Sequence, residues 1–213
     1  MNYKAYVFDF DYTLGDSTEG IVQCVNYALQ KLGIEGKPTE EIRRTIGLSL
    51  NQTYRVLSGD ENEQREILFS GYFKQKADEV MVENTKLYPK VKTCMERLKK
   101  EGSKIGIVTT KYHYRIAQIL AEFGAENLVD VIIGGEDVSE PKPNPEGLLS
   151  AIEQLKQDKK EILYVGDSLV DAETAQRAGV TFVGVLTGTT TEEEFERFPR
   201  LCIAQSVAEL LKK

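Results

Sequence analysis

The chain has 213 residues, of which 41% are hydrophobic and 29% are charged, and its formal net charge is −7. This composition is typical of a globular protein that is long enough for one sizeable core and a modest second lobe. An acidic chain without a concentrated basic patch is poorly suited to neutralising nucleic-acid phosphates, so we expect no DNA or RNA partner.

Short apolar runs predict the strands of a sheet, because none of them alternates with polar residues. They lie at residues 5–8, 105–108, 131–133, 162–165 and 182–185. Strands that are buried on both faces of a parallel sheet have this pattern. Between the runs, apolar residues recur at helical spacing, as at Val91, Met95 and Leu98 before Gly102. The alternation predicts an α/β fold with a Rossmann-like, doubly wound parallel sheet.

Residues 16–85 interrupt this alternation, because they show helical patterns and no convincing strand. The expected helices carry Ile21, Val25, Leu29 and Leu32, then a short helix from Thr39 to Ile46, then Ile67, Leu68, Tyr72 and Val80. A crossover loop is rarely this long. We therefore expect residues 16–85 to form an inserted α-helical domain that acts as a cap or lid, and residues 1–15 and 86–213 to form the α/β core.

Other features favour a soluble cytoplasmic protein. No apolar run has the length of a membrane span, and the first residues lack the layout of a signal peptide. Cys24, Cys94 and Cys202 are far apart and odd in number, which indicates inert thiols and not a disulfide framework or a zinc site. We assign no catalytic role to the single histidine, His113.

Charged and hydroxyl residues follow four of the predicted strands. Ligands of open α/β sheets bind outside the carboxyl ends of the strands, so we expect these residues to converge at one edge. The stretches are Asp9-Phe10-Asp11-Tyr12-Thr13, Thr109-Thr110-Lys111, Pro141-Lys142-Pro143, and Gly166-Asp167-Ser168 with Asp171.

In this order, the four stretches resemble the motifs of haloacid dehalogenase-like phosphatases, and the resemblance covers nearly the whole chain. It is strongest to the phosphoglycolate phosphatase-like and pyrophosphatase-like members, which carry a helical cap after the first strand. The resemblance implies a Mg²⁺-dependent phosphatase that acts on a small phosphorylated metabolite. It leaves open which metabolite this is, and the oligomeric state as well.

The resemblance implies that Asp9 is the nucleophile and that Asp11 is the general acid and base. The chemistry fits, because an ionised carboxylate can form an aspartyl-phosphate and split one hard displacement into two. Two residues apart on a strand, the two side chains start on the same face. The alternative is that they merely end a strand and cap a turn, which would be costly for two buried acids without a cation.

By resemblance, Mg²⁺ is held by the Asp9 carboxylate, the Asp11 backbone carbonyl and Asp167, while Asp171 orients a metal-bound water. Octahedral coordination by oxygen atoms suits this ion. Asp167 and Ser168 also suit a helix N-cap, and both roles are compatible. Asp171 is equally understandable as an acid in the first turn of a helix.

Lys142 corresponds to the family's lysine that ties the nucleophile to the phosphoryl group, and flanking prolines restrict its backbone. Thr109 matches the phosphate-binding hydroxyl, and Thr110 is a substrate-binding candidate. The alternatives are an exposed turn lysine and a plain strand-ending threonine. Lys111 and Glu136 could touch substrate or pair at the surface, and we assign neither a role.

In the expected cap, residues 43–50 resemble a loop that faces the active site, which makes Arg44 and Gly47 substrate-binding candidates. An exposed basic helix end with a C-cap glycine is an equal alternative. In the core, Tyr12 stands where members of the family often carry glycine.

Two other functions are weighed against hydrolysis. A phosphomutase of the β-phosphoglucomutase type usually has Glu-Asp-Ser where this chain has Gly166-Asp167-Ser168. A non-catalytic sensor of phosphate ligands would not need Asp11. A dehalogenase is disfavoured for the same reason, since that branch lacks the second acid.

Overall fold

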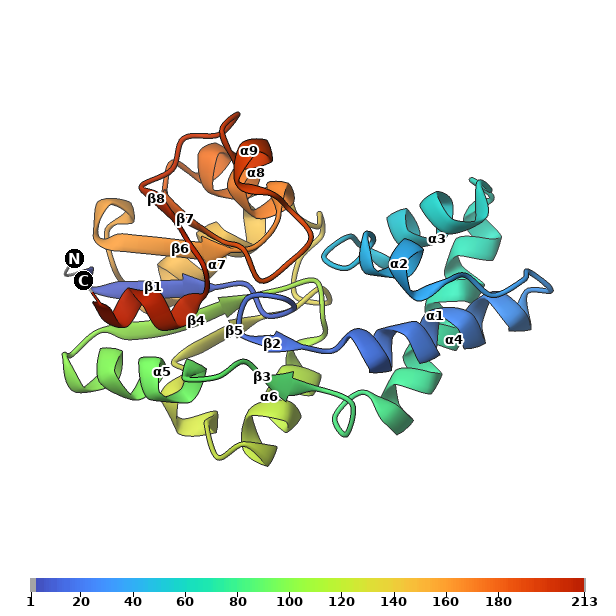
Figure 1. The fold of residues 1–213 in the computed structure, drawn as a ribbon, viewed down its shortest axis with the longest axis horizontal. Helices are drawn as coiled ribbons and strands as arrows, with labels where there is room; N and C mark the ends of the chain where they lie inside the picture. Colours follow the sequence, from blue (N-terminus) through green and yellow to red (C-terminus); the bar gives the residue numbers. More distant parts are fainter. Residues whose placement is uncertain (1–2, 213) are drawn as a thin grey trace. The chain divides into compact units, whose positions relative to one another are not determined.

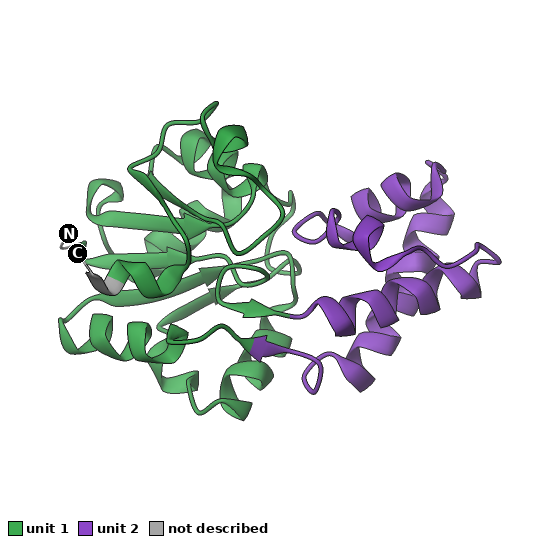
Figure 2. Ribbon diagram, viewed as in Figure 1, with its two compact units in different colours: residues 1–16, 87–213 green, residues 17–86 purple. Residues whose placement is uncertain are grey.

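The computed structural model describes residues 3–212 (Figure 1) and divides the chain into two compact units (Figure 2). Unit 1 comprises Met1–Asp16 and Leu87–Lys213, and unit 2 comprises Ser17–Lys86. The second unit is therefore an insertion into the first. The boundaries expected from the sequence differ from this division by one residue at each end.

Unit 1 is built on a six-stranded parallel sheet with the order β5-β4-β1-β6-β7-β8. The strands are β1 (Ala5–Phe8), β4 (Lys104–Val108), β5 (Val131–Ile133), β6 (Ile162–Gly166), β7 (Thr181–Val185) and β8 (Cys202–Ala204). From β1 the chain builds outward through β4 and β5, then returns to add β6 on the other side of β1. The strand order therefore reverses between β1 and β6, which is where open α/β sheets bind ligands.

Helices cover both faces of this sheet (Figure 1). They are α5 (Val91–Lys100), α6 (His113–Glu122), α7 (Glu146–Leu155), α8 (Leu169–Ala178) and the short α9 (Glu192–Phe195). Helices α7 and α8 pack with Ala5 and Val7 in one core cluster. Because layers lie on both sides, every residue of β1 is buried, as its unbroken apolar run predicts.

Unit 2 consists of four helices: α1 (Thr18–Lys31), α2 (Thr39–Arg43), α3 (Leu50–Ser58) and α4 (Glu63–Val80). Helix α1 packs along α4 and contributes Cys24, Val25 and Leu29 to the unit's own apolar core. The chain enters and leaves this unit through two short strands, β2 (Gly15–Asp16) and β3 (Lys86–Leu87), which form a two-stranded sheet.

The structure confirms the parallel α/β sheet and the helical insertion, and it corrects the expected packing of α4. Ile67 and Leu68 were expected on its packed face, but they are 63% and 41% exposed. The buried face instead carries Phe69, Phe73 and Ala77, which recur every four residues as a helical stripe requires. Helix α2 also ends at Arg43, short of the expected Ile46.

Two further elements lie outside the sequence-based prediction. Helix α3 begins at a capping box formed by Ser49 and Gln52. The edge strand β8 has only three residues, too few to show a pattern of its own. Within residues 3–212, none of the helices combines the length and the apolar character that crossing a membrane requires.

Candidate active site

The site lies at the carboxyl ends of β1 and β6, where the strand order reverses. Phe8 pairs with Val165 across these strands, and the backbone N–H of Asp9 donates to the carbonyl of Val165 at 2.9 Å. This register places Asp9 beside the start of the loop that carries Asp167. Both carboxylates are buried, as the sequence pattern at the strand ends predicts.

The Lys142 ammonium group links the two loops. Its Nζ donates to Asp9 Oδ1 at 2.8 Å and to Asp171 Oδ1 at 2.7 Å. The lysine is only 7% exposed, although it belongs to a loop before α7. A buried ammonium group between two carboxylates is fixed in position, so the alternative of an exposed turn lysine is wrong.

Asp171 accepts hydrogen bonds on both of its carboxylate oxygens. Oδ1 accepts from Lys142 and, at 2.8 Å, from the hydroxyl of Tyr164, while Oδ2 accepts from the Ser168 hydroxyl at 2.5 Å. Ser168 is the N-cap of α8, and Asp171 completes its capping box. Asp171 thus joins the start of α8 to Lys142. Its position also agrees with the alternative that it is an acid in the first turn of a helix.

The loop after β6 approaches α8 closely at Gly166. A Cβ atom on this residue would lie 2.5 Å from the Cβ and Cγ atoms of Asp171, closer than real side chains come. Glycine is therefore required for Asp171 to reach Lys142. A glutamate at position 166, as in the mutase pattern, does not fit this arrangement.

The turn that carries Asp11 and Thr13 folds back on itself after β1. Tyr12 has a φ of +61°, in the left-handed region, and its carbonyl accepts a hydrogen bond from the hydroxyl of Thr187. Glycine adopts this conformation without steric cost, which explains the family's preference at this position. The turn directs the Thr13 hydroxyl to Asp167 Oδ1 at 3.1 Å.

Asp11 faces a second buried lysine. Its Oδ2 lies 3.1 Å from Nζ of Lys111, and its Oδ1 is a buried oxygen with no hydrogen-bond partner among the described residues. The backbone N–H of Lys111 donates to the Thr109 hydroxyl at 3.2 Å, so the threonine shapes the loop that carries the lysine. Thr110, between them, is half-buried.

The concentration of acids has a clear electrostatic cost. Burial, together with the charges of Asp171 and Asp11, raises the pKa of Asp9 to about 7 against the opposing effect of Lys142. Burial and the charges of Asp171 and Asp9 likewise hold the pKa of Asp167 well above its ordinary value. These carboxylates need additional positive charge to remain ionised together.

A divalent cation fits this arrangement. Asp9, Asp167 and Asp171 are buried and offer carboxylate oxygens within 4.8 Å of one another. A donor set made only of oxygen atoms suits a hard ion such as Mg²⁺. The hydrogen bonds of Asp171 are already distributed among protein donors, so Asp9 and Asp167 are the members best placed to bind the ion directly.

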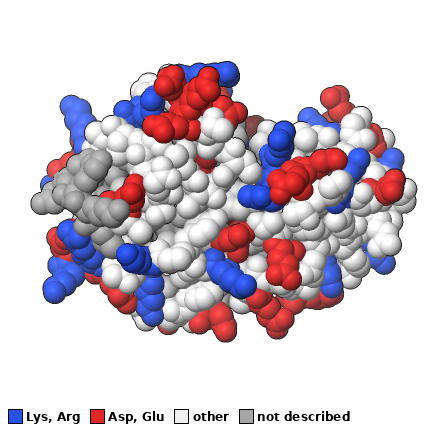
Figure 3. All heavy atoms as spheres, viewed as in Figure 1, with Lys and Arg blue, Asp and Glu red and all other residues white. Residues whose placement is uncertain are grey.

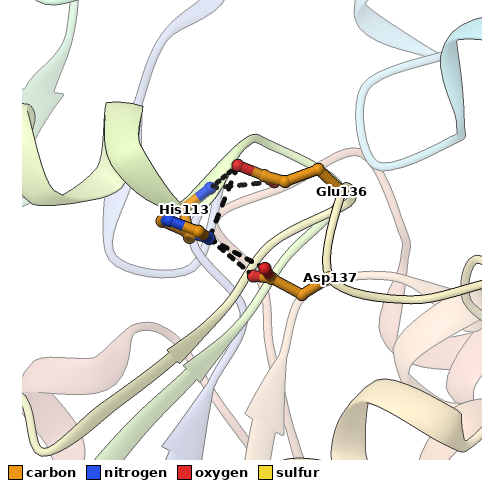
Figure 4. A group of neighbouring side chains, drawn as sticks. All are labelled: His113, Glu136 and Asp137. Atoms are coloured by element: carbon orange, nitrogen blue, oxygen red, sulfur yellow. Dashed lines mark hydrogen bonds and ion pairs between the residues drawn. The ribbon is translucent and has the colours of Figure 1, made fainter.

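A second group of possible ligands lies nearby on the surface (Figure 4), between the start of α6 and the loop after β5. Nδ1 of His113 donates to Asp137 Oδ2 at 2.8 Å, and the backbone N–H of His113 donates to Glu136 at 3.0 Å. Asp137 also accepts from the backbone N–H of Gly134. Glu136 therefore caps the first turn of α6, and Asp137 ties the His113 side chain to the loop after β5.

The sequence-based candidates fall into two sets. The structure brings Asp9, Lys142, Asp167 and Asp171 into one network, with Asp11 and Thr109 linked through Lys111. Arg44 and Gly47 belong to unit 2, where Gly47 has a φ of +97° and Arg44 is the C-cap of the short α2. The sequence alone assigns no role to Tyr164, Thr13 or Lys111. Tyr164 in particular lies in an apolar strand, where a tyrosine has the same pattern as a core residue.

The sequence is similar to those of known hydrolases. The model of the haloacid dehalogenase-like hydrolase family matches residues 6–185. A phosphoglycolate phosphatase of Rhodobacter capsulatus is 34% identical over 182 residues, which are 84% of this chain and 82% of the relative. Pyrophosphatase PpaX of Listeria innocua is 29% identical over 206 residues, which are 96% of this chain and 93% of the relative.

Solved structures show the same architecture. A protein from Bacteroides fragilis, described as a haloacid dehalogenase-like hydrolase, superimposes with a TM-score of 0.95 and is 44% identical. The match covers 98% of this chain and 99% of the other. The likeness therefore extends over the sheet and the helical insertion together.

Proposed function

This chain belongs to the haloacid dehalogenase-like hydrolase family and is a phosphatase, and we propose that it hydrolyses a small phosphorylated metabolite through an aspartyl-phosphate on Asp9 with the help of Mg²⁺. The observation that carries this proposal is the contact of the buried Asp9 with Lys142, beside Asp167, at the reversal of the strand order. A nucleophile, a charge-neutralising lysine and a metal ligand meet there.

In the first step, a carboxylate oxygen of Asp9 attacks phosphorus, and the bond from phosphorus to the leaving-group oxygen breaks. Asp11 gives its proton to that oxygen. In the second step, Asp11 takes a proton from water as the water attacks phosphorus, and the Asp9 carboxylate is released. One residue serves both steps because the second displacement reverses the roles of the first.

Lys142 stabilises the phosphoryl oxygens in both steps, because its ammonium group already lies 2.8 Å from the nucleophile. The Thr109 hydroxyl and the Thr110 side chain are proposed to contact the same phosphoryl group. Mg²⁺, held by the Asp9 carboxylate, the Asp11 carbonyl and Asp167, would supply further positive charge. Asp171 is proposed to act beside this ion through its hydrogen bonds with Lys142 and Ser168.

The printed names of the relatives suggest the substrate class. They include phosphoglycolate phosphatases and a pyrophosphatase, so we propose a phosphoglycolate-like monoester or pyrophosphate as the substrate. Arg44 and Gly47 of the insertion are proposed to recognise the leaving group. Arg44→Ala should then change kcat/KM among metabolites and leave hydrolysis of a small aryl phosphate nearly unaltered. Equal loss on every substrate would contradict this role.

The decisive experiment traps the intermediate. The purified protein is mixed with Mg²⁺ and phosphoglycolate, then treated with borohydride, which reduces an acyl phosphate to the alcohol. Mass spectrometry should find homoserine at position 9, and Asp9→Asn should give none. Release of inorganic phosphate separates hydrolysis from mutase activity, which would return the phosphoryl group to a sugar phosphate. Turnover without any trapped residue 9 would overturn the covalent mechanism.

A further inference from the structure

Lys111 is the second buried cation of the site, and the proposed mechanism does not use it. Only 6% of its side chain is exposed, and its ammonium group lies 3.1 Å from Asp11, the proposed general acid. Burying a lysine costs free energy unless its charge is paired. The ion pair with Asp11 therefore offsets the cost of burying the Lys111 ammonium group.

The two buried lysines differ in how firmly they are bound. Lys142 contacts two carboxylates, those of Asp9 and Asp171. In the described part of the chain, Lys111 forms an ion pair with one carboxylate, that of Asp11. Lys111 is therefore the cation that can exchange its partner at the lower cost.

The backbone of Lys111, in contrast, is held on both sides. Its N–H donates to the Thr109 hydroxyl, and its carbonyl accepts from the N–H of Gly135 at 3.0 Å. A Cβ atom at Gly135 would lie 2.5 Å from the carbonyl oxygen of Thr110, so only glycine permits this close approach of the two loops. A fixed backbone with an exchangeable side-chain partner is the arrangement expected of a ligand-binding lysine.

The charge of the site explains what such a ligand would be. Among the described residues, the loops that carry the proposed catalytic residues bury four carboxylates (Asp9, Asp11, Asp167, Asp171) and two ammonium groups (Lys111, Lys142), and the first turn of α6 buries Arg115 as well. Lys142 already contacts Asp9 and Asp171, and the proposed Mg²⁺ would be held by Asp9 and Asp167. A second anionic group on the substrate beside Asp11 would need another cation, and Lys111 is the candidate.

Distance supports this role. A general acid must come within about 3 Å of the leaving-group oxygen, so the ammonium group of Lys111 would lie within roughly 6 Å of that oxygen. A carboxylate or phosphate attached one or two bonds from the scissile oxygen falls in that range. A larger, uncharged leaving group offers nothing for Lys111 to bind.

We propose that Lys111 is a specificity-determining residue, which exchanges Asp11 for a second anionic group of the substrate next to the phosphoryl group. The inference rests on the proposed phosphatase function and deepens it. Binding of the anion would hold the leaving group against the lysine and leave the Asp11 carboxyl group facing the scissile oxygen. Selection for a second anion would thus be coupled to the placement of the acid.

The test compares substrates with and without a second anionic group. The first pair is 2-phosphoglycolate and its amide, and the second is pyrophosphate and acetyl phosphate, whose uncharged acyl group is at least as good a leaving group. In the wild-type protein, kcat/KM should be higher for the member with the second anion in at least one pair. Lys111→Met should lower the ratio of the two kcat/KM values in that pair by about tenfold or more, as expected for a lost charge-assisted hydrogen bond. Lys111→Arg, which keeps the charge, should retain most of the ratio.

The outcomes separate the two proposals. If the wild type hydrolyses an aryl phosphate but prefers neither anionic substrate, the role of Lys111 is overturned and the phosphatase function stands. If Lys111→Met lowers both kcat/KM values in a pair equally, the lysine serves the phosphoryl group or Asp11 alone, and the inference is also wrong. If the wild type hydrolyses no phosphate compound, the proposed function itself fails. Because the wild-type preference needs no variant, poor folding of Lys111→Met does not remove the test.

Discussion

Within residues 3–212, two groups of side chains have the spacing of a metal site, and they differ in almost every other respect. Asp9, Asp167 and Asp171 are buried at the reversal of the strand order, whereas His113, Glu136 and Asp137 lie on the surface nearby (Figure 4). Proximity alone therefore does not distinguish a functional centre from a helix cap.

The two groups differ in how the surrounding atoms compensate the charge of their carboxylates. Glu136 accepts from the backbone N–H of His113 at the start of α6, and Asp137 accepts from the backbone N–H of Gly134 in the loop after β5, so their charge has a structural explanation. Burial raises the pKa of Asp9 and of Asp167, so that pair needs a cation to be ionised together. A cost that the fold alone does not explain makes the buried group the candidate functional centre.

The largest effect is expected at the buried nucleophile. Asp9→Asn should fold normally and lose at least about 1,000-fold in kcat, because an amide cannot attack phosphorus and phosphate-ester hydrolysis is extremely slow without catalysis. The measurement is steady-state hydrolysis of an aryl phosphate, with circular dichroism as the folding control. Activity within about tenfold of the wild type, a barrier change of only ~1.4 kcal/mol, would contradict the covalent mechanism.

Metal dependence should also separate the two groups. Chelation with EDTA should abolish activity and Mg²⁺ should restore it, while Ca²⁺ supports it poorly because its longer bonds misplace the nucleophile. Asp167→Asn should raise the Mg²⁺ concentration for half-maximal activity by at least about tenfold.

The surface aspartate is the matched control for this experiment. Asp137→Asn should leave the half-maximal Mg²⁺ concentration within about twofold of the wild type, since the surface group is not expected to hold the ion. Full activity in thoroughly chelated buffer would refute the assigned metal ligands. Equal shifts in the Asp167→Asn and Asp137→Asn variants would remove the distinction between the groups.

A moderate effect is expected at Tyr164, whose hydroxyl holds Asp171 in place. Tyr164→Phe should lower kcat by about tenfold with little change in KM, because Asp171 then positions Lys142 less well. Tyr54→Phe is the control, since this buried hydroxyl donates to Asp60 in unit 2. It should change thermal stability and leave kcat unaltered. Parallel losses in both variants would indicate a purely structural role.

The smallest effect is expected at His113 and concerns stability. The hydrogen bond with Asp137 raises the pKa of His113 above its ordinary value, and the charges of Asp137 and Glu136 act in the same direction. The stabilisation is therefore fully present below the unfolded-state pKa of about 6.5 and is lost as the pH rises through the folded-state value. Because the side chain is half-exposed, its contribution should be at most about 1 kcal/mol.

Thermal melting can check this sign. His113→Asn should lower Tm relative to the wild type at pH 5.5 and have a smaller effect at pH 8.5. In an Asp137→Asn background, the difference between the two pH values should largely disappear. A loss that is independent of pH would show that His113 contributes by packing and not by charge.

The strand ends illustrate how far the sequence leads. An unbroken apolar run followed by Asp9 predicts both a buried strand and a site at its carboxyl end, because the geometry of parallel sheets connects the two. The strand-end pattern also brings Lys142 to this edge, but its direct pairing with Asp9, 133 positions away, is implied by the family resemblance and not by the pattern. Arg44 and Gly47 stay predictions.

Tertiary pairing accounts for what was missed. Tyr164 and Phe182 are both aromatic residues in buried strands and have the same sequence pattern. Only the fold shows that the Tyr164 hydroxyl reaches Asp171. In the sequence, Lys111 cannot be distinguished from any other polar residue that follows a strand. Its ion pair with Asp11 is visible only in the structure. On the face drawn in Figure 3, acidic and basic side chains are interspersed, and such surface charges carry no comparable signal.

The insertion has a consequence for how this chain can change over evolutionary time. It begins and ends at β2 and β3, two strands that pair with each other. A module whose two ends meet can be lengthened, shortened or exchanged without altering the connectivity of the sheet that positions Asp9. The helical module can therefore diverge while the strand ends that carry the buried carboxylates are inherited intact.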